Sequence, residues 1–267
     1  MLAVWQAADD IDVYESGWTF DHFYPIFSDS TGPCLEGWST LTALAQATKR
    51  LRLGTLVTGI HYRHPAVLAN MAAAVDIISE GRLDLGIGAG WNEEESGAYG
   101  IELGTLKERF DRFEEACQVL KGLLSQETTS FDGKFYQLKD ARNEPKGPQW
   151  PHPPICIGGS GEKRTLRTVA RLAQHWNYLG GPVDEFVRLR GVIDDHCADV
   201  GRDPGEIMTS THLWVDPAQP VDPAAIAAQA EAYVGRGLDL AIVYLHAPYD
   251  PAVLAPIAEA LAPLADA

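Results

Sequence analysis

The chain has 267 residues, of which 46% are hydrophobic and 22% are charged, a composition typical of a folded globular protein. Its formal net charge of -16 excludes partners that require a broad basic face, such as nucleic acid or an anionic membrane surface. A small-molecule ligand is therefore the class of partner that we expect.

The start of the chain, its apolar runs and its scattered cysteines favour a cytoplasmic protein. The first ten residues lack the basic start and apolar run of an export signal, and no stretch of about 18 residues is continuously apolar. Neither the histidines nor the cysteines have metal-binding spacing; the cysteines are Cys34, Cys117, Cys156 and Cys197. We expect neither a membrane span nor a bound metal.

In chain order, the segment before residue 16 reads as the end of a helix. Short β-rich runs then alternate with longer segments of helical periodicity. This alternation predicts parallel strands joined by crossover helices. Seven strands are expected, near residues 17–20, 51–57, 82–87, 154–157, 175–179, 207–214 and 238–245.

Two of the helices carry clear end signals. Pro65 suits the first position of one helix, and Gly81 suits its end. Thr105 and Glu108 have the spacing of a capping box at the start of a long amphipathic segment. Both segments are therefore predicted to be helical.

The length suits a single TIM (β/α)8 barrel, which uses about 250 residues. Because such a barrel needs eight strands, we expect one whose first strand is missing or truncated. The segment 125–153 breaks the alternation with a hairpin turn at Asp132-Gly133 and a proline-rich run. We interpret it as an insertion after the fourth strand and helix of the barrel, within one domain over residues 1–267.

Barrel enzymes build their sites at the carboxyl ends of the strands, and four such ends carry unusual residues. The first strand ends in Asp21-His22, which places two titratable side chains at the expected barrel mouth; a cap and a packed histidine are the alternative. The second runs into Thr58-Gly59, where glycine permits a bulge, although an ordinary turn also fits.

The third strand contains glycine at alternate positions, Gly86, Gly88 and Gly90. Glycine weakens a strand and often marks the close approach of a ligand or of another backbone. The G-x-G-x-G spacing differs from the dinucleotide-binding fingerprint, so a Rossmann fold is not expected.

The fourth strand ends in a glycine-rich loop, Gly158 to Gly161, that leads into a helix. Such a loop presents free backbone N–H groups at a positive helix end, which suits a phosphate. Lys163 and Arg164 oppose the helix dipole unless an anion offsets them. A flexible turn with solvated charges is the alternative.

Five segments together resemble the luciferase-like monooxygenase superfamily, and within it the coenzyme F420-dependent oxidoreductase branch. The resemblance is strong from about residue 15 to 180 and weaker beyond, and the family's first strand is absent from it. The segments are FDHF, LRLGTLVTGIHYRHPAVLA, LDLGIGAGWNEEE, LKERFDRFEEA and PICIGGSGEKRTLR.

The resemblance implies a barrel with the cofactor ring across its mouth and a backbone bulge beneath the ring. Thr58-Gly59 match this bulge, and a non-proline cis peptide bond there would fit the family. With the loop cations, the expected cofactor-binding residues are Asp21, His22, Thr58, Gly59, Ala89, Gly90, Trp91, Glu94, Gly158, Gly159, Ser160, Gly161, Lys163, Arg164 and Trp176.

The expected reaction is hydride transfer between the deazaflavin F420 and a small organic substrate. His22 is the first candidate for general acid/base and Glu94 the second. One alternative is an FMN-dependent monooxygenase; another is a non-catalytic protein that binds a flavin or deazaflavin. A homodimer is implied by the resemblance, with a flavin or F420 reductase as an indirect partner.

Overall fold

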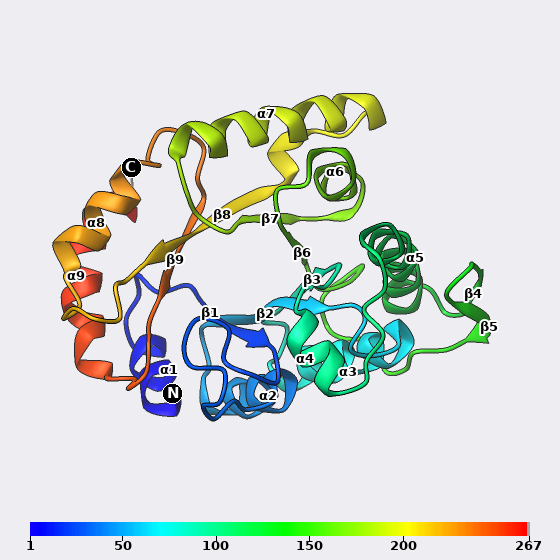
Figure 1. Ribbon diagram of the computed structural model, residues 1–267, viewed down its shortest axis with the longest axis horizontal. Helices are drawn as coiled ribbons and strands as arrows, with labels where there is room; N and C mark the ends of the chain where they lie inside the picture. The colour runs from blue at the N-terminus through cyan, green and yellow to red at the C-terminus, as the bar shows by residue number, and fades with distance from the viewer. Residues whose placement is uncertain (266–267) are drawn as a thin grey trace. The chain divides into compact units, whose positions relative to one another are not determined.

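The main feature of the computed structural model, which describes residues 1–265, is a sheet of seven strands in the order β1-β2-β3-β6-β7-β8-β9. β2 pairs in parallel with β3, as β7 does with β8 and β8 with β9. All seven predicted strands are confirmed, and helix α1 (Leu2–Asp9) fills the segment read as helical before them (Figure 1). The strands are β1 (Ser16–Asp21), β2 (Arg52–Gly59), β3 (Leu83–Gly88), β6 (Ile155–Gly158), β7 (His175–Tyr178), β8 (Met208–Trp214) and β9 (Leu240–Tyr244).

The described chain forms two compact units. Unit I consists of residues 18–46 and 52–156, and unit II of residues 1–17, 47–51 and those from 157 onward. The described residues contribute seven strands to the sheet, so the closed eight-stranded barrel and the single domain stay predictions.

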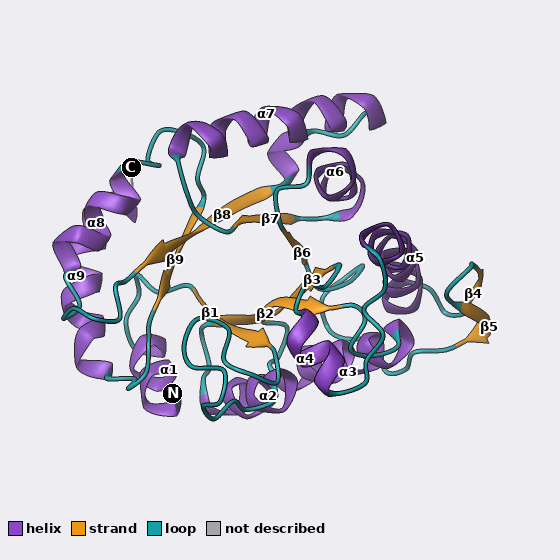
Figure 2. Ribbon diagram, in the orientation of Figure 1, coloured by secondary structure: helices purple, strands orange, loops and turns teal. Residues whose placement is uncertain are grey.

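In unit I, helices follow the strands along the chain, as the sequence predicts (Figure 2). The paired helices α3 and α5 pack against each other, and the capping box of α5 is confirmed with Thr105 and Glu108 as its partners. A core of fully buried side chains joins helices and strands; it includes Leu41, Leu53, Leu68, Leu85 and Phe113. The helices are α2 (Gly37–Ala47), α3 (Pro65–Ile78), α4 (Glu93–Ala98) and α5 (Leu106–Ser125).

The predicted insertion follows the third sheet strand of this chain and contains the expected hairpin. Strands β4 (Thr129–Asp132) and β5 (Gln137–Ala141) pair antiparallel. Carboxylates of the helices hold the insertion at two places. Glu115 of α5 accepts the backbone N–H groups of residues 134–136 in the hairpin turn, and Asp76 of α3 accepts the backbone N–H and the side-chain amide N–H of Gln149. The insertion is therefore an integral part of unit I.

In unit II, the stacked rings of Trp176 and Phe186 form the centre of one buried cluster. A second cluster contains Leu213, Ile226 and Ile257, where α8 packs against α9. The helices are the π-helix η1 (Glu162–Leu166), α6 (Arg167–Leu172), α7 (Val183–Val200), the 3-10 helix η2 (Pro204–Glu206), α8 (Pro223–Glu231), the 3-10 helix η3 (Pro251–Val253) and α9 (Leu254–Ala265). No described helix is long and apolar enough to cross a membrane.

A bulge in β2 shapes the sheet edge that carries the predicted site. The register of β2 against β3 shifts by one residue between Gly54 and Thr58. The non-proline cis peptide bond lies within this segment, at Leu56–Val57. The expected bulge and a non-proline cis peptide bond within it are both confirmed, but both lie just before Thr58-Gly59, the pair to which the sequence analysis assigned them.

The glycines of β3 make room for this bulge. A Cβ atom on Gly86 would lie 1.7 Å from the carbonyl oxygen of Thr55, and one on Gly88 would lie 2.7 Å from the side chain of Val57. The alternate glycines thus mark the close approach of the neighbouring strand, which was one of the two readings of their spacing.

We predict that Gly86→Ala lowers the free energy of unfolding by about 1–3 kcal/mol or more, because the added methyl group meets backbone that cannot rotate away. Urea unfolding followed by circular dichroism measures the loss. The matched control is Gly97→Ala in α4, where a Cβ atom has no neighbour within 4 Å and the helix should gain about 0.5–1 kcal/mol. Equal midpoints for the two variants would show that the bulge adapts to the methyl group.

A buried histidine should make unit II sensitive to acid. His175 bonds to the hydroxyl of Ser210, and burial lowers the pKa of this histidine from 6.5 to about 3. Between these two values the unfolded chain binds a proton that the folded chain does not, so stability falls as the pH drops below 6.5. The loss amounts to about 2 kcal/mol at pH 5.

His175→Gln should reduce this loss, since the variant cannot gain the proton at position 175. Chemical unfolding of both proteins at pH 7 and pH 5 measures the difference. The other buried histidines are present in both proteins, and parallel pH dependences would contradict the assignment to His175.

Candidate active site

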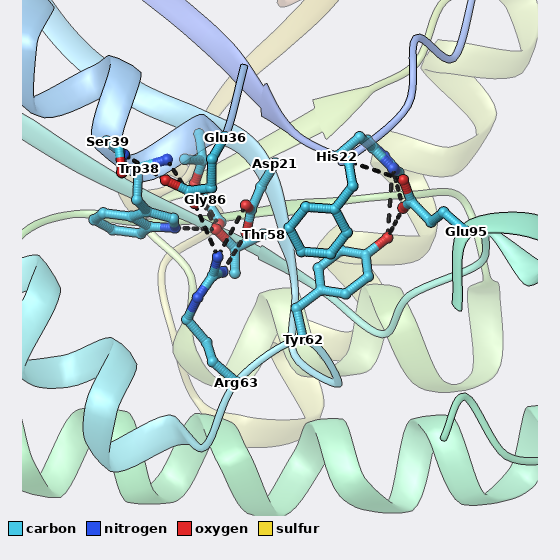
Figure 3. A network of polar contacts seen from close by, with 12 residues as sticks. Asp21, His22, Glu36, Trp38, Ser39, Thr58, Tyr62, Arg63, Gly86 and Glu95 are labelled. Atoms are coloured by element: carbon cyan, nitrogen blue, oxygen red, sulfur yellow. Dashed lines mark hydrogen bonds and ion pairs between the residues drawn. The ribbon is translucent and has the colours of Figure 1, made fainter. Parts of the chain in front are cut away.

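The carboxyl end of β1 places Asp21 and His22 next to each other, both buried. The Asp21 carboxylate forms an ion pair with Arg63, whose guanidinium also lies 3.2 Å from Glu36. Glu36 in turn accepts the backbone N–H groups of Trp38 and Ser39 at the start of α2 (Figure 3). Asp21 is therefore the buried end of a network that ties β1 to the segment after β2 and to α2.

His22 contacts a carboxylate that the sequence analysis did not select. Its Nδ1 atom lies 2.6 Å from Oε1 of Glu95, which is fully buried in α4. The hydroxyl of Tyr62 donates to the same oxygen, and the backbone N–H groups of Phe23 and Tyr24 donate to Oε2 at 2.9 and 3.3 Å. Figure 3 shows the His22 and Tyr62 side chains converging on Glu95.

The electrostatics of this cluster favour a charged Glu95. Burial raises the pKa of its carboxyl, but the hydrogen bonds from Tyr62 and Phe23 and the proximity of His22 outweigh burial, so the pKa is lowered. Burial and the negative charge of Glu95 raise the pKa of Tyr62 well above its usual value. Near neutral pH the phenol is thus a donor and the carboxylate an acceptor.

Aromatic side chains lie close to His22 and to the residue that follows it. The ring of Trp91 lies 5.4 Å from that of His22, and its side chain is 57% exposed. Phe23 stacks on Tyr99 with ring centroids 4.7 Å apart. A planar or apolar ligand would therefore meet aromatic faces beside the histidine.

The hydroxyl of Thr58 is buried and bonded within the bulge. Trp38 Nε1 donates to Thr58 Oγ1, which lies 2.9 Å from Thr55 Oγ1, and Thr55 donates to the carbonyl of Gly86. All of these polar atoms are satisfied within unit I (Figure 3). The part of Thr58-Gly59 that remains for a cofactor is the backbone.

The loop after β3 packs against His61. A Cβ atom on Gly90 would lie 2.3 Å from His61 Nδ1, so Gly90, between Ala89 and Trp91, lies directly against this ring. His61 Nε2 lies 3.1 Å from Ser96 Oγ, and burial, together with Arg112, lowers the pKa of His61 to about 4. His61 is neutral near pH 7 and supports the loop.

Glu94 lies apart from His22. Its side chain is exposed, and its contact is with Ser30 Oγ at 3.4 Å. In the run of three glutamates, only Glu95 lies on the buried face of α4, three residues after the N-cap Asn92, which accepts its backbone N–H. The cap was the signal that could have selected Glu95 from the sequence.

The glycine-rich loop lies in unit II, after β6. Gly159 has a φ of +121°, and its carbonyl accepts the indole N–H of Trp176 at 2.9 Å. Trp176 is fully buried, so it supports the loop from within the unit. Ser160 and Gly161 are exposed just before η1.

The two predicted cations lie in η1, directly after this loop. Lys163 is exposed and Arg164 is half-buried. The structure therefore groups the predicted residues within each unit, His22 with Trp91 in unit I and the loop with its cations and Trp176 in unit II.

Comparison with known proteins adds relatives with two different cofactors. The chain is 33% identical over 147 residues to an F420-dependent glucose-6-phosphate dehydrogenase of Amycolatopsis mediterranei, covering 54% of this chain and 43% of that protein. It is 31% identical over 167 residues to an FMNH2-dependent dimethylsulfone monooxygenase of Pseudomonas putida, covering 60% and 45%. Across eight such relatives, the chain spans between 43% and 60% of their length.

Solved structures agree on the fold. The coenzyme F420-dependent tetrahydromethanopterin reductase of Methanopyrus kandleri superimposes with a TM-score of 0.80 at 16% identity, covering 98% of this chain and 94% of that one. The family model for luciferase-like monooxygenases matches residues 6–262. Because this match extends over nearly the whole sequence, the chain belongs to the luciferase-like monooxygenase family.

Proposed function

We propose that this protein is an oxidoreductase that transfers a hydride between coenzyme F420 and a small organic substrate. The observation that carries the proposal is the buried pair of His22 and Glu95, which leaves one ring nitrogen of His22 available for a substrate proton. Relatives that are F420-dependent dehydrogenases support the choice of cofactor.

Each unit, taken by itself, carries residues that suit a part of an anionic deazaflavin. The exposed Ser160 and Gly161 precede a helix, with Lys163 in its first turn, which is the donor set and charge that phosphate requires. The backbone at Gly59 and the exposed Trp91 are the proposed contacts for the ring. When bound, the deazaflavin supplies the acceptor or donor carbon for the hydride.

The protein's own task in this reaction is to move one proton. In the direction of alcohol oxidation, the hydroxyl proton passes to His22 Nε2 while the hydride leaves the carbinol carbon. Glu95 stabilises the imidazolium that forms, because its charge lies 2.6 Å from Nδ1. In this scheme Glu95 takes the second role that the sequence analysis gave to Glu94, and Glu94 stays a prediction for cofactor contact.

An FMN-dependent monooxygenase is the second candidate, and the relative in Pseudomonas putida favours it. The same loop after β6 would serve the single phosphate of FMN, with a separate reductase as the source of reduced flavin. We further propose that the enzyme acts in the cytoplasm, as a homodimer.

We predict that His22→Asn lowers turnover by about 10²- to 10⁴-fold and leaves F420 binding nearly unchanged, because the amide cannot accept a proton at neutral pH. The assay follows the visible absorbance of F420 with glucose 6-phosphate and with 2-propanol. Cofactor binding is measured separately by fluorescence quenching. Turnover equal to that of the wild type would remove the proton-transfer role.

Cofactor choice is tested by titrating the protein with F420 and with FMN. Lys163→Ala should weaken F420 binding about two- to fivefold, the size expected for one exposed ion pair, and should affect FMN less, because the F420 tail carries more charge. Lys121→Ala, on α5 in unit I, is the matched control. Tight binding of FMN without binding of F420 would establish the second candidate instead.

A further inference from the structure

Four polar groups contact the Glu95 carboxylate, two at each of its oxygens. Oε2 accepts two backbone N–H groups, from Phe23 and Tyr24. Oε1 accepts the hydroxyl of Tyr62 and lies 2.6 Å from Nδ1 of His22. The backbone donors fix the carboxylate in place, so Oε1 is the oxygen through which side chains interact.

Hydrogen-bond chemistry determines where the protons lie. An ionised carboxylate only accepts, and the Tyr62 phenol has one proton, which goes to Glu95 because that contact is the shorter one. The phenol oxygen also lies 3.4 Å from His22 Nδ1, too far to compete with the 2.6 Å bond to Glu95. His22 Nδ1 must therefore carry a proton, and Nε2 is the basic atom of the neutral ring.

We propose that Glu95 and Tyr62 act as a pair of positioning residues for His22. Glu95 holds the ring in its Nδ1–H tautomer, and Tyr62 shares Oε1 with His22 and thereby moderates how strongly the carboxylate stabilises the imidazolium. The inference rests on the proposed function, which gives His22 its task in proton transfer. The tautomer of His22 and the effects of Glu95 and Tyr62 on it are properties of the protein without cofactor.

The proposal makes opposite predictions for two substitutions. Glu95→Gln removes the negative charge beside the ring, so His22 should protonate at a pH lower by about one unit or more. Tyr62→Phe removes only a hydroxyl and leaves all of Oε1 to His22, so protonation should move to a higher pH, by about half a unit. If Glu95 and Tyr62 only packed against His22, the two substitutions would shift the pH of His22 protonation in the same direction or not at all.

Other ionisable groups near His22 are the same in both variants. Asp21 precedes it in the chain and is paired with Arg63. Cys34 donates its thiol to the carbonyl of His22, and burial raises the pKa of that thiol. His61, whose ring lies 4.0 Å from that of Tyr62, has a pKa of about 4 and carries no charge in the range of interest.

The experiment is a pH titration of the apoprotein labelled with ¹⁵N-histidine, in which the ring nitrogen shifts report both tautomer and protonation. His22→Asn identifies the signals. We expect Nδ1–H in the wild type and in Tyr62→Phe, and loss of this preference in Glu95→Gln. Glu93→Gln, an exposed neighbour on α4 paired with Arg109, is the matched control and should leave the His22 signals unchanged.

An Nε2–H tautomer in the wild type, or shifts of the same sign in the two variants, would overturn the proposal. If Glu95→Gln does not fold, the wild-type tautomer and the upward shift in Tyr62→Phe still decide it, because Phe keeps the ring that packs on Phe23. Failure of the proposed function would give a different result. The wild type would show the Nδ1–H tautomer, but His22→Asn would retain full turnover.

Discussion

The burial of the Glu95 charge is the constraint on which the candidate site depends. A carboxylate removed from water is unfavourable unless donors replace the water it loses. Here two backbone N–H groups, a phenol and an imidazole take that place. Because these donors come from the end of β1 and from the segment after β2, while the carboxylate belongs to α4, satisfying one charge brings together three parts of unit I that are distant in sequence.

Buried polar groups also find partners within the protein at the bulge of β2. The hydroxyls of Thr55 and Thr58 form a chain from the Trp38 indole to the carbonyl of Gly86. A backbone that departs from the regular ladder leaves polar atoms without their usual partners, and these side chains supply substitutes. Glycine on the neighbouring strand then allows the displaced backbone to approach, so the two strands specify the irregularity jointly.

Much of this architecture could be predicted from the sequence, because strand alternation and helix caps are local signals. The seven strands and the capping box of α5 are of this kind. Pairwise contacts were harder, since they depend on register. Three adjacent glutamates have the same chemistry in the sequence, and only the turn of α4 set by Asn92 distinguishes buried Glu95 from exposed Glu94. The position of the cis bond was also missed by two residues. The Thr58-Gly59 pair is conspicuous in the sequence, but the bulge lies just before it.

The proton machinery and the cofactor determinants have separate physical origins. In the proposed function, His22, Glu95 and Tyr62 handle a proton, a task that suits either a flavin or a deazaflavin enzyme, so this cluster carries little information about the cofactor. In the proposed function, discrimination between the cofactors depends on charge at the loop after β6, where Lys163 would contact an anionic tail in a chain whose formal net charge is -16. Because the rest of the negatively charged surface repels a polyanion, a local cation contributes most to binding where it offsets this repulsion. A ligand with a longer anionic tail therefore depends more on these few cations, and the choice between F420 and FMN becomes a question of local electrostatics rather than of fold.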